Sequence, residues 1–143
     1  MKKILFLLIF LLLCSMIIFA EPLNVTIEIS EVLPNQGNII IAIFNSKSDY
    51  KNNKPYKALT IDSTSTTLLV DEILPNGEYV ISMFQDKNGN GKLDTYIFGI
   101  PKEPIGITNY FKKGIPRGFN KLKIQINEDK MIIKINMIHF GGK

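Results

Sequence analysis

The chain has 143 residues and carries 17 lysines and arginines, 13 aspartates and glutamates, one histidine, one cysteine and no tryptophan. A length of this order fits one domain. The sequence pI is 9.1, but the basic residues are spread along the chain, whereas a nucleic-acid-binding face needs clustered lysine and arginine. The composition therefore argues against a nucleic-acid partner and against enzymes built on a cysteine nucleophile or a thiolate-bound metal.

Residues 1–20 form the most apolar part of the chain. Lys2 and Lys3 precede an apolar run over residues 4–19, and the polar body of the protein follows directly after Ala20. A short basic start, an apolar run and a small residue at the cut are typical of a secretory signal peptide. We expect cleavage after Ala20 and export to the periplasm or to the outside of the cell.

Two other fates of this leader bear on the expected location. The apolar run is shorter than the about twenty residues that span a bilayer, so an uncleaved N-terminal anchor is the alternative. Lipidation of Cys14 is not expected, because the bulky Leu13 precedes it. Residues 21–143 then form a single domain without cysteine, without a stable membrane span and with roughly 38% hydrophobic residues, which suits a small domain with an apolar core.

The body of the chain shows the period-two alternation of β-strands, and we identify no segment of helical period long enough for a helix. Turn signals such as Pro75-Asn76-Gly77 separate the apolar runs. About seven strands at this spacing predict an all-β fold, an antiparallel β-sandwich. The expected strands cover residues 23–29, 38–44, 58–61, 67–73, 78–84, 120–127 and 131–138, the last two as a closing hairpin.

One long segment, residues 95–118, breaks this pattern. It is rich in proline and glycine, so regular strands are not expected there. A loop longer than about fifteen residues in a small domain is functional or disordered in most cases. Its apolar residues favour an ordered lid packed against the sandwich, and the simpler interpretation is that they cap the core.

The segment from residue 86 to residue 94 has the most distinctive chemistry. Oxygen-bearing side chains recur at Asp86, Asn88, Asn90 and Asp94, which are positions 1, 3, 5 and 9 of the segment. Calcium is a hard cation that takes six to eight oxygen ligands, and spacing of this kind wraps a short loop around one point. The sequence therefore predicts a possible, weak calcium site.

Further residues complete this candidate site. Gly91 at position 6 permits a sharp turn, and Lys92 at position 7 can offer its backbone carbonyl. The bidentate glutamate expected at position 12 is missing, because Ile97 stands there. Glu103 is the nearest acidic side chain that could fold back to replace it.

A bare turn is the competing interpretation of the same segment. Asn88-Gly89 and Asn90-Gly91 are both dipeptides that accept positive φ in hairpins. A plain hairpin needs only one such pair, however, and has no use for the extra oxygens. Calcium remains attractive for an exported protein, because extracellular modules use sites with dissociation constants on the order of 10⁻⁴ to 10⁻³ M.

Residues 77–103, with the motif at 84–94 and the Phe-Gly-Ile-Pro-Lys-Glu run at 98–103, resemble the bacterial exported family DUF2141. The resemblance extends over about residues 23–138. It implies a small exported protein whose β-sandwich is similar to transthyretin or to the carboxypeptidase regulatory domain. The family has no established activity, and this chain departs from its pattern at residues 104–109.

The sequence points to no reaction. The only histidine, His139, has no nucleophile or acid nominated beside it. We therefore expect a non-catalytic binding or accessory module, with an envelope protein or a glycan as possible partner. Two alternatives remain: a hydrolase-like enzyme with a pocket under residues 95–118 and Asp94 or Glu103 as acid or base, and a structural envelope protein that self-associates through an edge strand.

Overall fold

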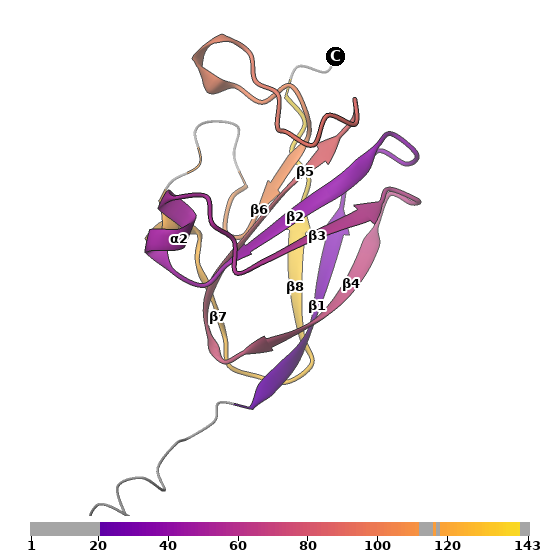
Figure 1. The fold of residues 1–143 in the computed structure, drawn as a ribbon. Coiled ribbons are helices and arrows are strands. Elements are labelled where there is room, and N and C mark those ends of the chain that lie inside the picture. The colour runs from indigo at the N-terminus through magenta and orange to yellow at the C-terminus, as the bar shows by residue number, and fades with distance from the viewer. Residues whose placement is uncertain (1–20, 112–115, 117, 141–143) are drawn as a thin grey trace, which may run out of the picture.

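The protein is a β-sandwich in the computed structural model, which describes residues 21–111, 116 and 118–140. The signal peptide prediction and Cys14 lie outside this range. Two sheets pack face to face (Figure 1), one with strand order β4-β1-β8 and one with order β3-β2-β5-β6, in which β7 also pairs with β5. The strands are β1 (Pro22–Ser30), β2 (Asn38–Phe44), β3 (Lys57–Asp62), β4 (Leu68–Pro75), β5 (Gly77–Asp86), β6 (Ile105–Ile107), β7 (Ile124–Ile126) and β8 (Met131–Asn136). The prediction of an all-β sandwich is confirmed.

The helical elements are short and lie in connections. They are α2 (Lys47–Lys51), the 3₁₀ turn η1 (Ile97–Gly99) and α3 (Phe119–Leu122). The hydroxyl of Ser46 caps α2 by accepting the Asp49 N–H at 3.1 Å, which satisfies one of the free donors of the first turn. Among the described residues, we find no helix with the length and apolar character needed to cross a bilayer.

Alternating side chains build the core between the two sheets. In β1, β2 and β5 every second residue points inward, and most of these side chains are fully buried. Isoleucine dominates this inner layer, and its β-branched side chain suits the pleated surface of a strand. The innermost residues, all less than 2% exposed, include Ile27, Ile29, Ile39, Ile41, Ile43 and Ile81.

A second apolar cluster covers the outer face of the larger sheet. Val80 of β5 and Phe44 of β2 are buried there against Ile105 and Ile107 of β6 and against Phe119 of α3. Part of the segment 95–118 is thus packed on the sandwich as expected. Residues 112–115 and 117 of that segment lie outside the described residues.

The structure corrects three details of the predicted topology. The strand at 120–127 is replaced by α3 and the short β7, and no hairpin joins β7 to β8. Instead β7 runs antiparallel to β5, while β8 runs parallel to β1 in the other sheet. The connection between them crosses from one sheet to the other, which alternation along the sequence cannot reveal. In addition, β6 forms within the segment where regular strands were not expected.

Candidate functional site

The candidate loop begins where β5 ends, at one end of the sandwich (Figure 1). Asp86 is the last residue of β5 and pairs with Asn38 of β2, so its backbone is fixed by the sheet. The turn before β2 passes close to the Asp86 backbone at Gly37, which has a φ of 82°. A Cβ atom at this position would lie 1.8 Å from the Asp86 carbonyl oxygen. Only glycine fits this position, and the loop therefore starts from a rigid base.

The carboxylate of Asp86 organises the first half of the loop. Its Oδ1 accepts the N–H groups of Gly89 at 2.9 Å and Asn90 at 3.2 Å, and its Oδ2 accepts the N–H of Gly91 at 2.8 Å. Gly89 and Gly91 have φ values of 71° and 73°, a left-handed conformation that glycine adopts without strain. The chain thus wraps around a carboxylate that is only 4% exposed.

The amides of Asn88 and Asn90 converge on Asp94. Its Oδ2 accepts Nδ2 of Asn88 at 2.6 Å and Nδ2 of Asn90 at 3.0 Å. The amide oxygens face the backbone: Oδ1 of Asn88 accepts the Asn90 N–H at 3.1 Å, and Oδ1 of Asn90 accepts the Lys92 N–H at 2.8 Å. The structure therefore gathers the side chains at positions 1, 3, 5 and 9 into one loop.

Glu103 folds back onto this loop and closes its base. Its Oε1 accepts the Lys87 N–H at 2.9 Å, and its Oε2 accepts the Asp94 N–H at 3.1 Å. Glu103 is buried, with only 4% of its surface exposed. The single carboxylate of Glu103 therefore joins the backbone of Lys87, at position 2, to the backbone of Asp94, at position 9. We call this pair of hydrogen bonds the Glu103 clamp, and it stands in for the missing glutamate at position 12.

The three carboxylates of this loop have no cationic side chain in direct contact among the described residues. Asp86 and Glu103 are buried and Asp94 is half-buried, yet in the described part of the chain no lysine, arginine or histidine nitrogen lies within 4.0 Å of any of the three carboxylates. Backbone N–H groups offset part of the cost of burying a charge. A bound cation would offset more of it, since buried charges are normally paired or coordinate metals.

The donor set fits a hard cation only in part. Among the described residues, no three histidine, cysteine, aspartate or glutamate side chains form a metal cluster, so a calcium site here needs the amide oxygens and the Lys92 carbonyl as well. Carboxylate and amide oxygens each carry two lone pairs, so an oxygen that accepts one N–H retains one for an ion. This holds for Oδ2 of Asp86 but not for its Oδ1, which accepts two N–H groups. The two asparagine amides present nitrogen to Asp94, and ligation would require them to rotate.

Gln85 is a polar residue of this region that the sequence analysis missed. It is fully buried and holds the turn before β2: Oε1 accepts the Leu33 N–H at 3.0 Å, and Nε2 donates to the carbonyls of Leu33 at 2.6 Å and Gln36 at 3.0 Å. It continues the inward row of β5 after Ile81 and Met83. A polar residue in an inward position is the signal that could have identified it.

A hollow of about 530 Å³ lies beside the loop, on the outer face of the larger sheet. Its floor includes Ile40 and Phe84, and Leu93 and Pro101 form part of its wall. Neither Asp94 nor Glu103 is among its described lining residues. The enzyme alternative placed its pocket under residues 95–118, and Gly99 and Pro101 of that segment line this hollow. The two carboxylates nominated for catalysis accept hydrogen bonds within the loop instead.

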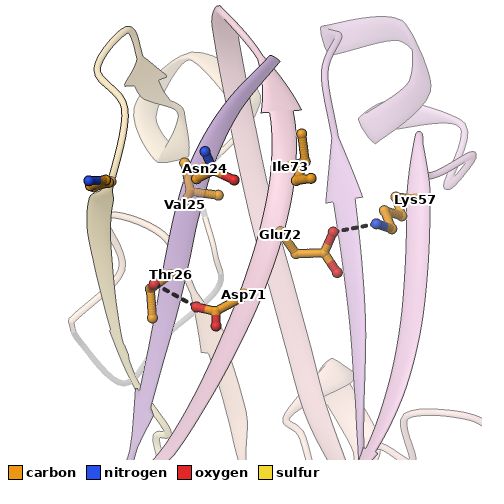
Figure 2. Close-up of a pocket in the computed structure, with 8 residues that line it drawn as sticks. Asn24, Val25, Thr26, Lys57, Asp71, Glu72 and Ile73 are labelled. Carbon is orange, nitrogen blue, oxygen red and sulfur yellow. Dashed lines mark hydrogen bonds and ion pairs between the residues drawn. The ribbon is translucent and has the colours of Figure 1, made fainter.

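A second hollow, of about 580 Å³, lies along the strands β1 and β4 and reaches β3. Figure 2 shows Glu72 and Lys57 pointing toward each other across the open side of the sandwich, where they form an ion pair. On the opposite face of β4, the Thr26 hydroxyl donates to Asp71 at 2.7 Å. These four polar side chains of the hollow thus pair with each other, Glu72 with Lys57 and Asp71 with Thr26, which indicates a structural role for them.

Outside the loop, two tyrosines have raised pKa values and the histidine has a backbone partner. Burial raises the pKa of the Tyr50 hydroxyl, and burial followed by the nearby Tyr56 raises the pKa of Tyr79. His139 contacts the Glu31 carbonyl oxygen at 2.8 Å through Nε2. That contact with a backbone carbonyl gives His139 a structural partner and no catalytic one.

The fold and the loop define a class: a β-sandwich with an aspartate- and asparagine-rich loop clamped at one end by a buried glutamate. The sequence profile of one family, described as "Uncharacterized protein conserved in bacteria (DUF2141)", matches residues 27–134. The chain belongs to the DUF2141 family. No curated protein and no solved structure matches it.

Proposed function

We propose that this chain is an exported, non-catalytic β-sandwich that works as a binding or accessory module, and that its loop at residues 86–94 binds calcium weakly. The observation that carries the calcium proposal is the set of three carboxylates, two of them buried, for which the described residues provide no cationic partner within 4.0 Å. The proposed ligands are oxygens of Asp86, Asn88, Asn90 and Asp94 with the Lys92 carbonyl. Glu103 supports them from the base.

The Lys92 carbonyl adds to this argument. It accepts no hydrogen bond from any donor among the residues that the structure describes. A free carbonyl at position 7 of an oxygen-rich loop is available to a hard cation. Because a ligand that binds only the folded state stabilises it by mass action, calcium would stabilise a domain that has no disulfide.

Export is supported by the leader at residues 1–20, which combines a basic start, an apolar run and Ala20 at the cut. We propose a mature domain of residues 21–143 in the periplasm or outside the cell. Its two-sheet architecture is consistent with a transthyretin-like sandwich. Mass spectrometry of the exported protein tests this directly: a mature chain that starts at Glu21 supports the proposal, and a chain that retains residues 1–20 in the membrane contradicts it.

A catalytic role has less support. Both oxygens of Glu103 accept backbone N–H groups, and Oδ2 of Asp94 accepts hydrogen bonds from two side-chain amides. Neither residue is among the described residues that line the hollow. We therefore keep the proposal of a binding or accessory module, with an envelope protein or a glycan as its partner.

Thermal unfolding with calcium tests the proposed site. For a dissociation constant of about 1 mM, calcium at about 10 mM stabilises the folded state by about 1.4 kcal/mol, which raises the melting temperature of a domain this size by a few degrees. The Asp94→Asn variant keeps the shape of the side chain, so we expect it to melt like wild type in chelator but to lose most of the calcium shift. Asp71→Asn, the same charge change on β4, is the matched control and keeps the shift.

Magnesium at the same concentration provides the second control. Magnesium demands near-ideal octahedral geometry and gives up its water reluctantly, so it raises the melting temperature less than calcium. Equal responses of wild type, D94N and D71N to calcium would show general screening of charge and would contradict the proposed site.

A further inference from the structure

An apolar tip projects from the connection between β5 and β6, past the end of the sandwich (Figure 1). We define the apolar tip as Tyr96, Ile97, Phe98 and Ile100, whose exposed fractions are 55%, 80%, 91% and 49%. Single exposed apolar residues are common on protein surfaces, but a contiguous group marks an interaction site.

The tip is held in shape by its own backbone. Thr95 and Pro101 form a β-bridge at its base, and the Tyr96 N–H donates to the Ile100 carbonyl at 2.7 Å. The Gly99 N–H donates to the Tyr96 carbonyl at 3.2 Å, which closes the turn at Phe98. Because Glu103 also fixes the base of the neighbouring loop, the tip presents its apolar side chains outward without further folding.

Positive charge flanks the tip on both sides. Lys92 precedes it and Lys102 follows it, and both residues are exposed. The Lys102 Nζ atom lies 5.3 Å from the centre of the Tyr96 ring. No acidic residue occurs between Asp94 and Glu103, and of these two Glu103 is buried and Asp94 half-buried, whereas both lysines are exposed.

We propose that the apolar tip docks this protein on an anionic phospholipid bilayer. Phe98 and Ile97 enter the acyl region, Tyr96 lies at the headgroup level, and Lys92 and Lys102 meet the phosphates. Apolar side chains next to basic residues are the pattern of interfacial membrane binding, in which buried apolar area and attraction to anionic lipid act together. The proposal does not rest on calcium, since the tip is built by hydrogen bonds of the chain itself.

A second copy of the chain is the competing occupant. The apolar hollow floored by Ile40 and Phe84 lies beside the tip, and Gly99 is among its lining residues. The lysines favour the bilayer, because the described lining of this hollow contains no acidic side chain to receive them. Self-association is therefore an outcome that the experiment must detect.

Co-sedimentation with vesicles tests the proposal, using residues 21–143, which contain every described strand and helix and lack the apolar leader. One set of vesicles is equimolar phosphatidylglycerol and phosphatidylcholine, and the other is phosphatidylcholine alone. The test variant is Ile97→Ser with Phe98→Ser. The matched control is Leu69→Ser with Ile73→Ser, because these β4 side chains are also exposed, at 68% and 60%.

We expect wild type and the β4 control to bind the anionic vesicles equally and neutral vesicles about tenfold more weakly. The tip variant should lose at least about tenfold in partitioning, since each large apolar side chain withdrawn from the bilayer costs about one power of ten or more. These ratios should hold in chelator and in calcium, so failure of the calcium proposal leaves the result readable. Failure of wild type to bind, or equal binding by the tip variant, would overturn the proposal, as would a wild-type dimer that the tip variant converts to monomer.

Discussion

The Glu103 clamp gives the sharpest structural prediction. Replacing it with alanine removes the acceptor of two backbone N–H groups, those of Lys87 at 2.9 Å and Asp94 at 3.1 Å. Hydrogen bonds to a charged group contribute about 1.5–3 kcal/mol each, and water can reach part of the opened loop. We therefore expect Glu103→Ala to lower the free energy of unfolding by about 2–4 kcal/mol.

Urea unfolding in chelator measures this effect without any contribution from calcium. Glu103→Gln keeps one acceptor oxygen but turns an amide N–H₂ toward the other backbone donor, so it should lose about half as much as alanine or more. Glu128→Ala is the control, since Glu128 is exposed, and it should lie within about 0.5 kcal/mol of wild type. If Glu103→Ala also lies within that margin, the clamp does not hold the loop.

Two further predictions concern residues outside the loop. Gly106→Ala places a Cβ atom 2.8 Å from Ile135 Cγ2 in the packed core, so it should destabilise the fold by about 1–3 kcal/mol in urea. Gly118→Ala meets no atom within 4 Å and changes only the N-cap of the short helix α3, so it should cost less, about 0.5 kcal/mol. Equal effects of the two substitutions would contradict the packing argument. Hydrogen bonds from the Asn24 backbone and side chain hold the pKa of Asp129 below its ordinary value of 3.8. The stability that this carboxylate provides is therefore present at neutral pH and lost as the pH falls through its folded-state value, so melting curves of Asp129→Asn and wild type should converge toward low pH; a constant difference at every pH would refute this.

Local sequence pattern predicted the strands well where one face is buried. The predicted strand at 38–44 matches β2, because its alternating isoleucines point into the core. The sequence pattern could not assign the C-terminal strands to sheets, because the alternation of Ile124 and Ile126 identifies a strand but not its partner. Both β7 and β8 pair with strands far away in sequence. Turn residues around β6 concealed a strand that is fixed by its pairing with β5.

The candidate site was predictable only as far as its residues lie close together in the sequence. Spacing alone placed Asp86, Asn88, Asn90 and Asp94 in one loop, and the structure brings them together. The fold-back of Glu103 onto the loop was also predicted, but its role as a clamp of backbone N–H groups depends on the loop conformation. The turn held by the buried Gln85 depends on Leu33 and Gln36, which are about fifty residues away in the chain and invisible to local patterns.

A crystal structure of residues 21–143 grown with calcium is the most direct measurement of the proposed site. If calcium binds, we expect one electron-density peak within the loop. It should lie about 2.3–2.6 Å from oxygens of Asp86, Asn88, Asn90 and Asp94 and from the Lys92 carbonyl oxygen. The amides of Asn88 and Asn90 should have turned their oxygens toward that peak. A loop without such density at saturating calcium, with both amide nitrogens still bonded to Asp94, would contradict the account.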